Sequence, residues 1–286
     1  MVTSGQRRAV VTDACTRRAL PVARACRYFG VHRTLLRYVP RRSPQEALRA
    51  RLRELAIAKP RWGSPRLTWR LRREGWLVNH KRVERLVREE RLLVGQRPRR
   101  KRVAQVRVPT PVPTRPDERW SMDFLHDTLA DGRPFRIWAL VDDATREAPL
   151  LLVDRSLPAT RVVEALDMLL LVRGRPNAIV CDNGPEFVSL ALDQWASTHG
   201  IRLDFIRPGR PVENCFIESF NGKLRDECLN QHHFLTLAEA QERIEAWRQE
   251  YHTERPHRGL GQRTPAEYLA LFTPQETDVR APILRC

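Results

Sequence analysis

Residues 178–229 read AIVCDNGPEFVSLALDQWASTHGIRLDFIRPGRPVENCFIESFNGKLRDECL, and this stretch decides the fold class. Its apolar opening, residues 178–181, is typical of a short buried strand. Helical periodicity follows at 187–199, a strand pattern at 201–205 and a second helical pattern at 213–229. Helices that alternate with strands in this way indicate an α/β sheet.

Three more strands and one more helix are predicted directly upstream of this stretch. The strand patterns lie at residues 120–125, 135–141 and 149–153, and the helical pattern lies at 158–172. A three-stranded meander followed by alternating helices and strands predicts a mixed α/β sheet. Residues 237–251 predict a further helix after the deciding stretch.

Two aspartates stand out by their positions in the predicted strands. Asp182 follows the apolar run directly, at the strand end where ligands bind in α/β sheets. Asn183 and Glu186, which come next, resemble a helix-starting cap. Asp123 lies in the sequence WSMDF, on the strand face opposite the one shared by Trp120, Met122 and Phe124.

A third carboxylate, Glu218, lies on a predicted amphipathic helix. The apolar side of this helix is predicted to be buried and carries Phe216, Phe220 and Leu224. The opposite polar stripe, which is predicted to be exposed, carries Asn214, Glu218, Asn221 and Arg225.

Each of these carboxylates taken alone is typical of a turn, a cap or a solvated helix face. Three converging carboxylates, however, repel one another unless cations lie between them. Their hard oxygen ligands suit Mg²⁺ or Mn²⁺. Two such ions, about 3.5–4 Å apart, can stabilise both the attacking and the leaving oxygen of a phosphodiester displacement.

The charge of the chain is strongly uneven. Residues 1–116 contain 31 Lys+Arg and 7 Asp+Glu, whereas the remaining residues contain 20 and 27, out of totals of 51 and 34. This asymmetry predicts a basic module that binds a polyanion, and the preference for arginine points to nucleic acid. A ribosomal-type or simply arginine-rich protein remains an alternative on charge alone.

Two helical pairs lie in the basic part. Residues 16–39 show a helix, a turn at Gly30 and a second helix, which is the pattern of a helix-turn-helix. A second pair is predicted at 64–74 and 80–91, with Gly75 and Asn79 at the helix ends. The side chains expected to face DNA are His32, Arg33, Thr34 and Arg37 in the first pair, and Lys81, Arg82, Arg85 and Arg88 in the second.

The remaining composition narrows the class of protein. None of the six cysteines forms a CxxC pair, so we predict reduced thiols and no zinc ribbon. No apolar run approaches the roughly 20 residues of a membrane span, and the N-terminus has no signal-peptide pattern. We therefore expect a cytoplasmic protein without a membrane partner.

The combined motifs resemble the bacterial insertion-sequence transposases that share the retroviral-integrase catalytic core. The matching strings are WSMDF, VDDATRE, CDNGPEF, LDFIRPGRPVENCFIESFNGKLRDECL and YHTERPHRGLGQRTPAEYL. The family separates its second aspartate from its glutamate by 35 residues, as Asp182 and Glu218 are separated here, and places a Lys or Arg seven positions later, here Arg225. The run Arg146-Glu147-Ala148-Pro149 departs from the more usual Cys-containing stretch.

The resemblance implies an RNase H-like α/β core, preceded by a small all-helical DNA-binding region. It implies that two Mg²⁺ or Mn²⁺ ions are bound by Asp123, Asp182 and Glu218, and that DNA is contacted by Asn183, Asn214, Lys223 and Arg225. The implied reaction nicks an element end and joins the freed 3′-OH to another phosphodiester. The implied partners are double-stranded DNA (terminal inverted repeats and target), further copies of the chain in synapsis, and a protein from an upstream reading frame; on DNA the chain would be associated with the nucleoid.

The predicted domains are residues 1–42 (helix-turn-helix-like), 43–94 (helical, DNA-binding), 95–118 (basic proline-rich linker), 119–230 (catalytic core) and 231–286 (C-terminal helical extension). Two other functions remain open at this point. One is a DNA-binding protein without catalysis, either a regulator or a degenerate copy. The other is an RNase H-type nuclease, which the large basic region disfavours.

Overall fold

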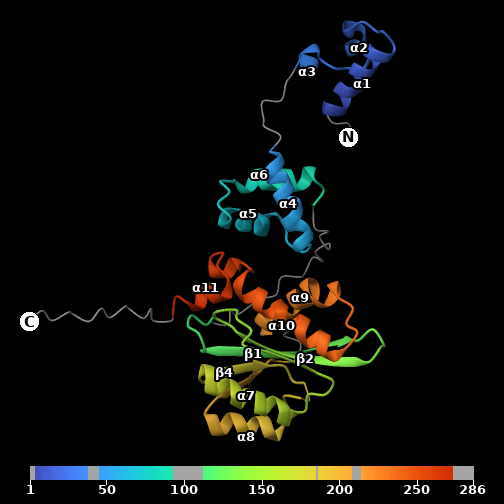
Figure 1. Cartoon of the computed structure of the whole chain (residues 1–286). Coiled ribbons are helices and arrows are strands. Elements are labelled where there is room, and N and C mark those ends of the chain that lie inside the picture. The colour runs from blue at the N-terminus through green and yellow to red at the C-terminus, as the bar shows by residue number, and fades with distance from the viewer. Residues whose placement is uncertain (1–3, 38–44, 93–111, 185, 208–213, 273–286) are drawn as a thin grey trace, which may run out of the picture. The chain divides into compact units, whose positions relative to one another are not determined.

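The computed structural model describes residues 4–37, 45–92, 112–184, 186–207 and 214–272. It divides into two compact units, residues 1–51 and 52–286. The first unit contains α1 (Ser4–Arg17), α2 (Val22–Tyr28) and α3 (Arg33–Arg37), coloured blue in Figure 1. Gly30 turns the chain between α2 and α3 with a φ of +61°, as the predicted helix-turn-helix requires. The helix α1 was not predicted.

The first unit is held by a small apolar cluster. Its buried members are Val11, Ala25, Cys26 and Val31. These residues come from α1, α2 and the turn before α3, so α1 completes a core that the predicted pair alone could not close.

A second set of helices follows. It consists of α4 (Glu46–Ala58), which crosses the boundary between the units, α5 (Ser64–Arg73) and α6 (His80–Glu89). Gly75 has a φ of +86° just after α5, and the Asn79 side chain accepts a hydrogen bond from the Lys81 amide at the start of α6. Both predicted helix ends are confirmed, whereas α4 was not predicted.

The larger unit is built on a five-stranded sheet in the order β3-β2-β1-β4-β5. The strands are β1 (Arg119–Thr128), β2 (Pro134–Asp142), β3 (Leu150–Asp154), β4 (Ala178–Cys181) and β5 (Arg202–Phe205). The first three pair antiparallel as a meander, while β4 pairs parallel with both β1 and β5. The predicted mixed sheet is confirmed.

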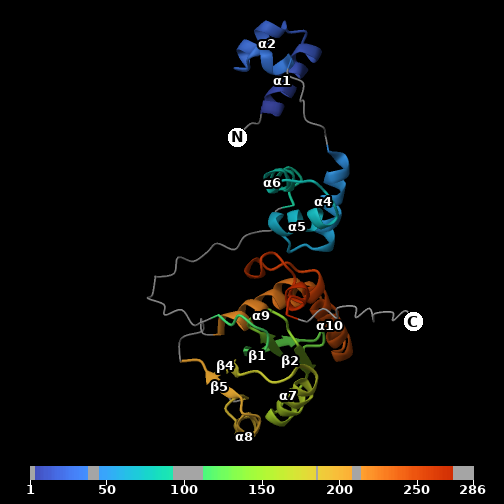
Figure 2. The same ribbon diagram turned by 90° about the vertical axis from the view of Figure 1, so that its left-hand side faces the viewer.

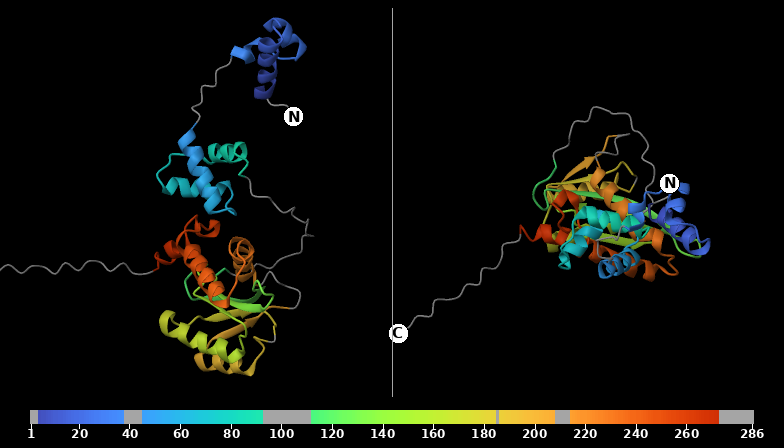
Figure 3. Two further views of the ribbon diagram at one scale, coloured as in Figure 1. Left: turned by 45° about the vertical axis from the view of Figure 1, so that its right-hand side comes forward. Right: turned by 90° about the horizontal axis from the view of Figure 1, so that it is seen from above.

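Helices cover both faces of this sheet, as Figures 1, 2 and 3 show. One face carries α7 (Ala159–Arg173) and α8 (Leu190–His199), and the other carries α9 (Cys215–Glu227) and α10 (Leu237–Thr253). Short elements complete the chain: η2 (Leu229–Gln231), η3 (Arg258–Leu260) and α11 (Pro265–Leu269).

Alternation along the strands assigns side chains to two hydrophobic clusters. Trp120 and Met122 of β1 pack with α7 and α8, whereas Leu125 packs with α9 and α10. Asp123 therefore belongs to the face covered by α9, opposite Trp120 and Met122, as the pattern predicted.

The remaining predictions concern the linker, the cysteines and membrane-spanning segments, and some of them fall outside the described residues. Residues 95–111 of the predicted 95–118 linker, with the basic run PRRKR, and Cys286 lie outside them. The five described cysteines are all free thiols. Within the described part of the chain, no helix is both long and apolar enough to cross a bilayer.

Candidate active site

The register of the sheet brings the two predicted aspartates to neighbouring strands. Arg119, Trp120 and Ser121 of β1 pair with Ala178, Ile179 and Val180 of β4. The same offset carried two residues further sets Asp123 beside Asp182, which directly follows β4. Two carboxylates thus emerge next to each other from parallel strands.

The surroundings of Asp123 hold its side chain in place. Its Oδ1 accepts a hydrogen bond from the Phe124 amide at 2.8 Å, and its Oδ2 accepts one from the Asn221 side chain at 2.8 Å. Burial is the main reason that the pKa of Asp123 is raised to about 6. The negative charges of Asp182 and Glu218 raise this pKa further, while the two hydrogen bonds lower it. The three carboxylates are therefore close enough to interact electrostatically.

The loop after β4 is shaped around the Asp182 carboxylate. Asp182 Oδ1 accepts a hydrogen bond from the Gly184 amide at 2.9 Å. A Cβ atom at Gly184 would lie 2.9 Å from that same Oδ1 and 3.0 Å from Oε2 of Glu186. Only glycine leaves both carboxylates undisturbed, so residue 184 is set by close approach and not by an unusual backbone angle.

The predicted helix cap at Asn183 and Glu186 is wrong. Helix α8 begins at Leu190, where the Ser189 side chain accepts from the Leu192 amide. Glu186 instead forms an ion pair with Arg136 of β2, and the Asn183 side chain donates to the Ile206 carbonyl at 2.8 Å. These side chains fasten the loop to neighbouring segments, which local sequence could not reveal.

Glu218 lies on helix α9, which covers the sheet face to which Asp123 belongs. Glu218 is exposed, but its helical neighbours on the predicted polar stripe are not all solvated. Asn221 is 8% exposed and bonds Asp123, and Asn214 is 3% exposed and donates to the Met122 carbonyl at 3.4 Å. The stripe faces strand β1 over part of its length, so the interpretation of Asn221 as a surface residue is wrong. Asn221 is a site residue that sequence patterning missed.

The apolar side of α9 also differs from the prediction at one position. Phe220 and Leu224 are buried as predicted, and Ile217 joins them. Phe216 is only half-buried, and its ring lies 3.7 Å from the Arg146 guanidinium and 5.8 Å from that of Arg119. Cation–π contacts hold this ring at the edge of the core.

The two predicted DNA-contacting cations on α9 have different surroundings. Arg225 is exposed. Lys223 donates a hydrogen bond to the Ser219 hydroxyl at 2.9 Å. Burial, followed by the nearby charge of Arg255, lowers the pKa of Lys223 to about 7. An anion bound beside this amine would stabilise its protonated form and so raise its pKa again.

The candidate DNA-facing residues of the helical segments all lie at the surface or close to it. His32, Arg33, Thr34 and Arg37 are exposed on or beside α3, as are Lys81, Arg82 and Arg88 on α6. Two of the α6 arginines form i,i+4 ion pairs, Arg85 with Glu89 and Arg88 with Glu84. Exposed pairs of this kind contribute about 0.3–0.5 kcal/mol, so a phosphate can replace either carboxylate.

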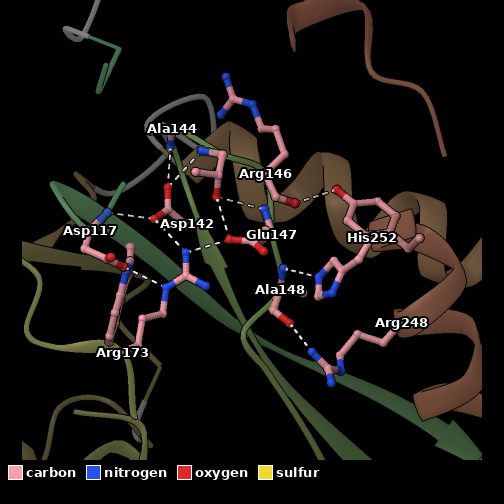
Figure 4. A network of polar contacts seen from close by, with 12 residues as sticks. Asp117, Asp142, Ala144, Arg146, Glu147, Ala148, Arg173, Arg248 and His252 are labelled. Atoms are coloured by element: carbon pink, nitrogen blue, oxygen red, sulfur yellow. Dashed lines mark hydrogen bonds and ion pairs between the residues drawn. The ribbon is translucent and has the colours of Figure 1, made fainter. Parts of the chain in front are cut away.

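A largely buried ionic network lies at the C-terminal end of strand β2, around its last residue, Asp142 (Figure 4). Arg173 of α7 bonds Asp117 at 2.8 Å, Glu147 at 2.7 Å and the fully buried Asp142 at 3.4 Å. Asp142 also accepts from the Ala144 and Thr145 amides. The Ala148 amide then donates to His252 of α10. The run from Arg146 to Pro149, where the sequence departs from the family pattern, thus joins helices on both sheet faces.

The donor set suits a divalent cation although the described residues contain no formed metal cluster. Among them, no three His, Cys, Asp or Glu side chains stand close enough together to hold an ion. The charges of Asp182 and Glu218 nevertheless act on Asp123 and add to the effect of burial in raising its pKa, and a bound cation would offset both. Carboxylate oxygens are the ligands that Mg²⁺ and Mn²⁺ prefer.

Comparison with known protein families agrees with this arrangement. Residues 113–211 and 199–265 each match a family described as an integrase core domain, and residues 44–102 match one described as an HTH-like domain. A simian T-cell lymphotropic virus intasome chain superposes with a TM-score of 0.50 over 82% of this chain and 80% of its own, at 14% identity. That likeness concerns the fold, which is the RNase H-like fold of integrase cores.

Two insertion-element proteins are similar over most of the chain. An IS407 protein of 31.7 kDa from Burkholderia multivorans is 46% identical over 86% of this chain and 90% of its own length. An IS476 protein of 39.2 kDa from Xanthomonas euvesicatoria is 43% identical over 91% of this chain and 75% of its own length. This chain therefore belongs to the insertion-sequence transposases of the integrase-like group, a family of DDE polynucleotidyl transferases.

Proposed function

We propose that this chain cuts DNA at the ends of its mobile element and joins those ends to a target duplex. Asp123, Asp182 and Glu218 are the metal-binding catalytic carboxylates in this proposal. The convergence of these three groups from β1, the end of β4 and α9 is the observation that carries it. Burial is the main cause of the raised pKa of Asp123, and the negative charges of Asp182 and Glu218 raise it further, which supports a site where a cation would be bound.

Two Mg²⁺ or Mn²⁺ ions, when bound, would supply charge stabilisation to the attacking and leaving oxygens of the phosphodiester. The protein's own contribution is orientation. Asn221 fixes the Asp123 carboxylate through its 2.8 Å hydrogen bond, and the Gly184 amide fixes that of Asp182. Ligands that are already oriented by such hydrogen bonds lose less conformational freedom when the metal binds, which favours the reaction.

The proposed DNA contacts of the core are made by basic side chains of α9. Arg225 lies on α9 two turns beyond Glu218, and Lys223 lies between them with its depressed pKa. Together with Asn183, these residues would hold the strand being cut. Asn214 was also predicted to contact DNA, but it is buried against β1 and would orient α9 instead. Arg33, Arg37, Lys81, Arg82 and Arg88, which are exposed, and the partly exposed Arg85 would bind the terminal inverted repeats and the flanking duplex.

Assembly and location are also part of the proposal. Synapsis of two element ends calls for at least two copies of the chain, and a protein from an upstream reading frame would be a further partner. The working location is the cytoplasm, on the nucleoid when DNA is bound. The division of labour follows the predicted domains at 1–42, 43–94, 95–118, 119–230 and 231–286.

The test is a binding and cleavage assay on a labelled duplex that carries one element end. Wild type, Glu218→Gln and Asp226→Asn are compared with Mg²⁺ present, since Asp226 is an exposed acid on the same helix and controls for lost charge. All three proteins should shift the duplex in a gel, and only Glu218→Gln should fail to cut it. Cleavage by Glu218→Gln at the wild-type rate would contradict the catalytic role. Binding without cleavage by the wild type would favour a non-catalytic DNA-binding protein.

A further inference from the structure

We propose that Arg136 is a positioning residue that locks together the two chain segments carrying Asp123 and Asp182. The proposal rests on the proposed function, because it assigns a role toward those two carboxylates. Arg136 lies on β2, next to β1, and pairs in register with His126. Neither its position nor its type attracts notice in the sequence.

The first contact of Arg136 reaches the segment of Asp123. Its guanidinium carbon lies 4.4 Å from the centre of the Phe124 ring, the residue directly after Asp123. The Phe124 ring in turn stacks on Phe187 at 5.0 Å between ring centres, and Phe187 is 1% exposed. The guanidinium therefore covers the Phe124 ring and helps to hold it against the hydrophobic core, which fixes the residue next to Asp123.

The second contact reaches the loop of Asp182. A terminal nitrogen of Arg136 donates to Oε1 of Glu186, four residues after Asp182. The side chains of this pair are 20% and 28% exposed. Although burial raises it, the pKa of Glu186 is held below its usual range by a backbone hydrogen bond and by Arg136. Glu186 is thus ionised and held by the arginine.

The other oxygen of Glu186 lies close to the catalytic carboxylate. Glu186 Oε2 and Asp182 Oδ1 flank the same point beside Gly184, at 3.0 and 2.9 Å from the position of a Cβ atom there. An unpaired negative charge at Glu186 would repel Asp182 and compete for its cations. Arg136 pairs with Oε1 of Glu186 and so offsets this charge while Oε2 stays beside Asp182.

One further feature indicates that Arg136 is held in place by its surroundings. Within the described residues, its Nε atom is buried and has no hydrogen-bond partner. A buried donor without a partner is costly and persists where neighbouring contacts determine the geometry. Here those contacts are the aromatic stack and the ion pair.

The test compares Arg136→Gln, Glu186→Gln and the double variant with wild type. Arg133→Gln is the matched control, because Arg133 is an exposed arginine in the turn before the same strand. Two quantities are measured: the cleavage rate across a Mg²⁺ titration, and the rise in melting temperature that Mg²⁺ or Mn²⁺ causes without DNA. The metal-free melting temperature verifies that each variant folds.

Arg136→Gln should lower the cleavage rate by about 10- to 100-fold at low Mg²⁺ and should reduce the metal-induced rise in melting temperature. The double variant should recover much of this loss, because the competing charge at residue 186 is gone. Should Arg136→Gln fail to fold, Glu186→Gln still tests the proposal. The Mg²⁺ concentration that this variant needs for half-maximal cleavage should differ from that of the wild type, and an equal concentration would count against the proposal.

Two results would overturn the inference. One is a wild-type rate and Mg²⁺ dependence in Arg136→Gln; the other is an equal loss in the single and double variants, which would mean that Arg136 acts only through packing. Failure of the proposed function is a separate result. In that case wild type and Arg133→Gln would be as inactive as Asp182→Asn in the same assay.

Discussion

Replacing Asp123 by asparagine should stabilise the metal-free protein while abolishing its chemistry. The folded protein raises the pKa of this carboxyl from 3.8 to about 6, so the ionised form is disfavoured in the native state. Asparagine copies the neutral form at every pH. It also fits the local hydrogen bonds, because the buried Oδ1 of Asn221 has no partner among the described residues and can accept from the new amide once Asn221 flips.

The size and pH dependence of this effect follow from the two pKa values. A difference of about two units at about 1.36 kcal/mol each amounts to about 3 kcal/mol. Because the folded pKa is the raised one, the wild type has its full stability below the unfolded pKa and loses it as pH rises through about 6. The variant should therefore be more stable by about 3 kcal/mol at pH 8 and by less than about 1 kcal/mol at pH 4.

Urea unfolding of the two proteins at pH 4, 6 and 8 in EDTA measures this difference. Asp127→Asn, on the same strand and the same face, controls for the loss of one negative charge. Adding Mg²⁺ at pH 8 should stabilise the wild type and not Asp123→Asn. The reasoning is refuted if Asp123→Asn is less stable than wild type at pH 8, or if the gap is the same at pH 4.

Three further substitutions have definite expected outcomes. Gly184→Ala should leave the circular-dichroism melt unchanged but slow cleavage at least about tenfold, because its methyl group displaces the Asp182 carboxylate; an unchanged rate would argue against the close approach. Asn221→Ala removes a hydrogen bond to ionised Asp123, so the acidic limb of the pH–rate profile should move up by roughly one unit, and a fixed profile would exclude this role. Arg173→Met leaves the buried acids Asp142 and Glu147 without their cation, so the free energy of unfolding in urea should fall by about 3–5 kcal/mol. The exposed control Arg161→Met should lower it by less than about 0.5 kcal/mol. Equal small losses in the two variants would show that the network is not stabilising.

Most of the sheet could be predicted from the sequence because alternation of apolar residues is a strong local signal. The face that Asp123 takes follows directly from Trp120 and Met122 on the other side. The start of α8 could not be predicted in the same way, because Phe187 fits a helical pattern but packs on Phe124 instead. Helix α1 was missed because its apolar periodicity is weak. Helix α4 was missed although Leu48, Leu52 and Leu55 recur at helical spacing and are buried.

The three carboxylates of the proposed site could be named from sequence motifs, whereas the side chains that hold Asp123 and the Asp182 loop could not. Helical spacing indicates which residues of α9 share a side, but it does not say that this side faces β1, which is why Asn221 was placed at the surface. Arg136 carries no local signal at all, because its partners come from elsewhere in the chain: Phe124 from strand β1 and Glu186 from the loop after β4. Such contacts depend on the register of the sheet, which no short motif encodes.

The most direct measurement of the central claim is strand transfer in a purified reaction. Wild type and Asp182→Asn are each incubated with Mg²⁺ and a supercoiled plasmid that carries the element's terminal repeats, and nicked and joined products are separated on a gel. The account predicts both products with the wild type and neither with Asp182→Asn, although both proteins bind the repeats. Joined products with Asp182→Asn, or none with a wild type that binds the repeats, would contradict it.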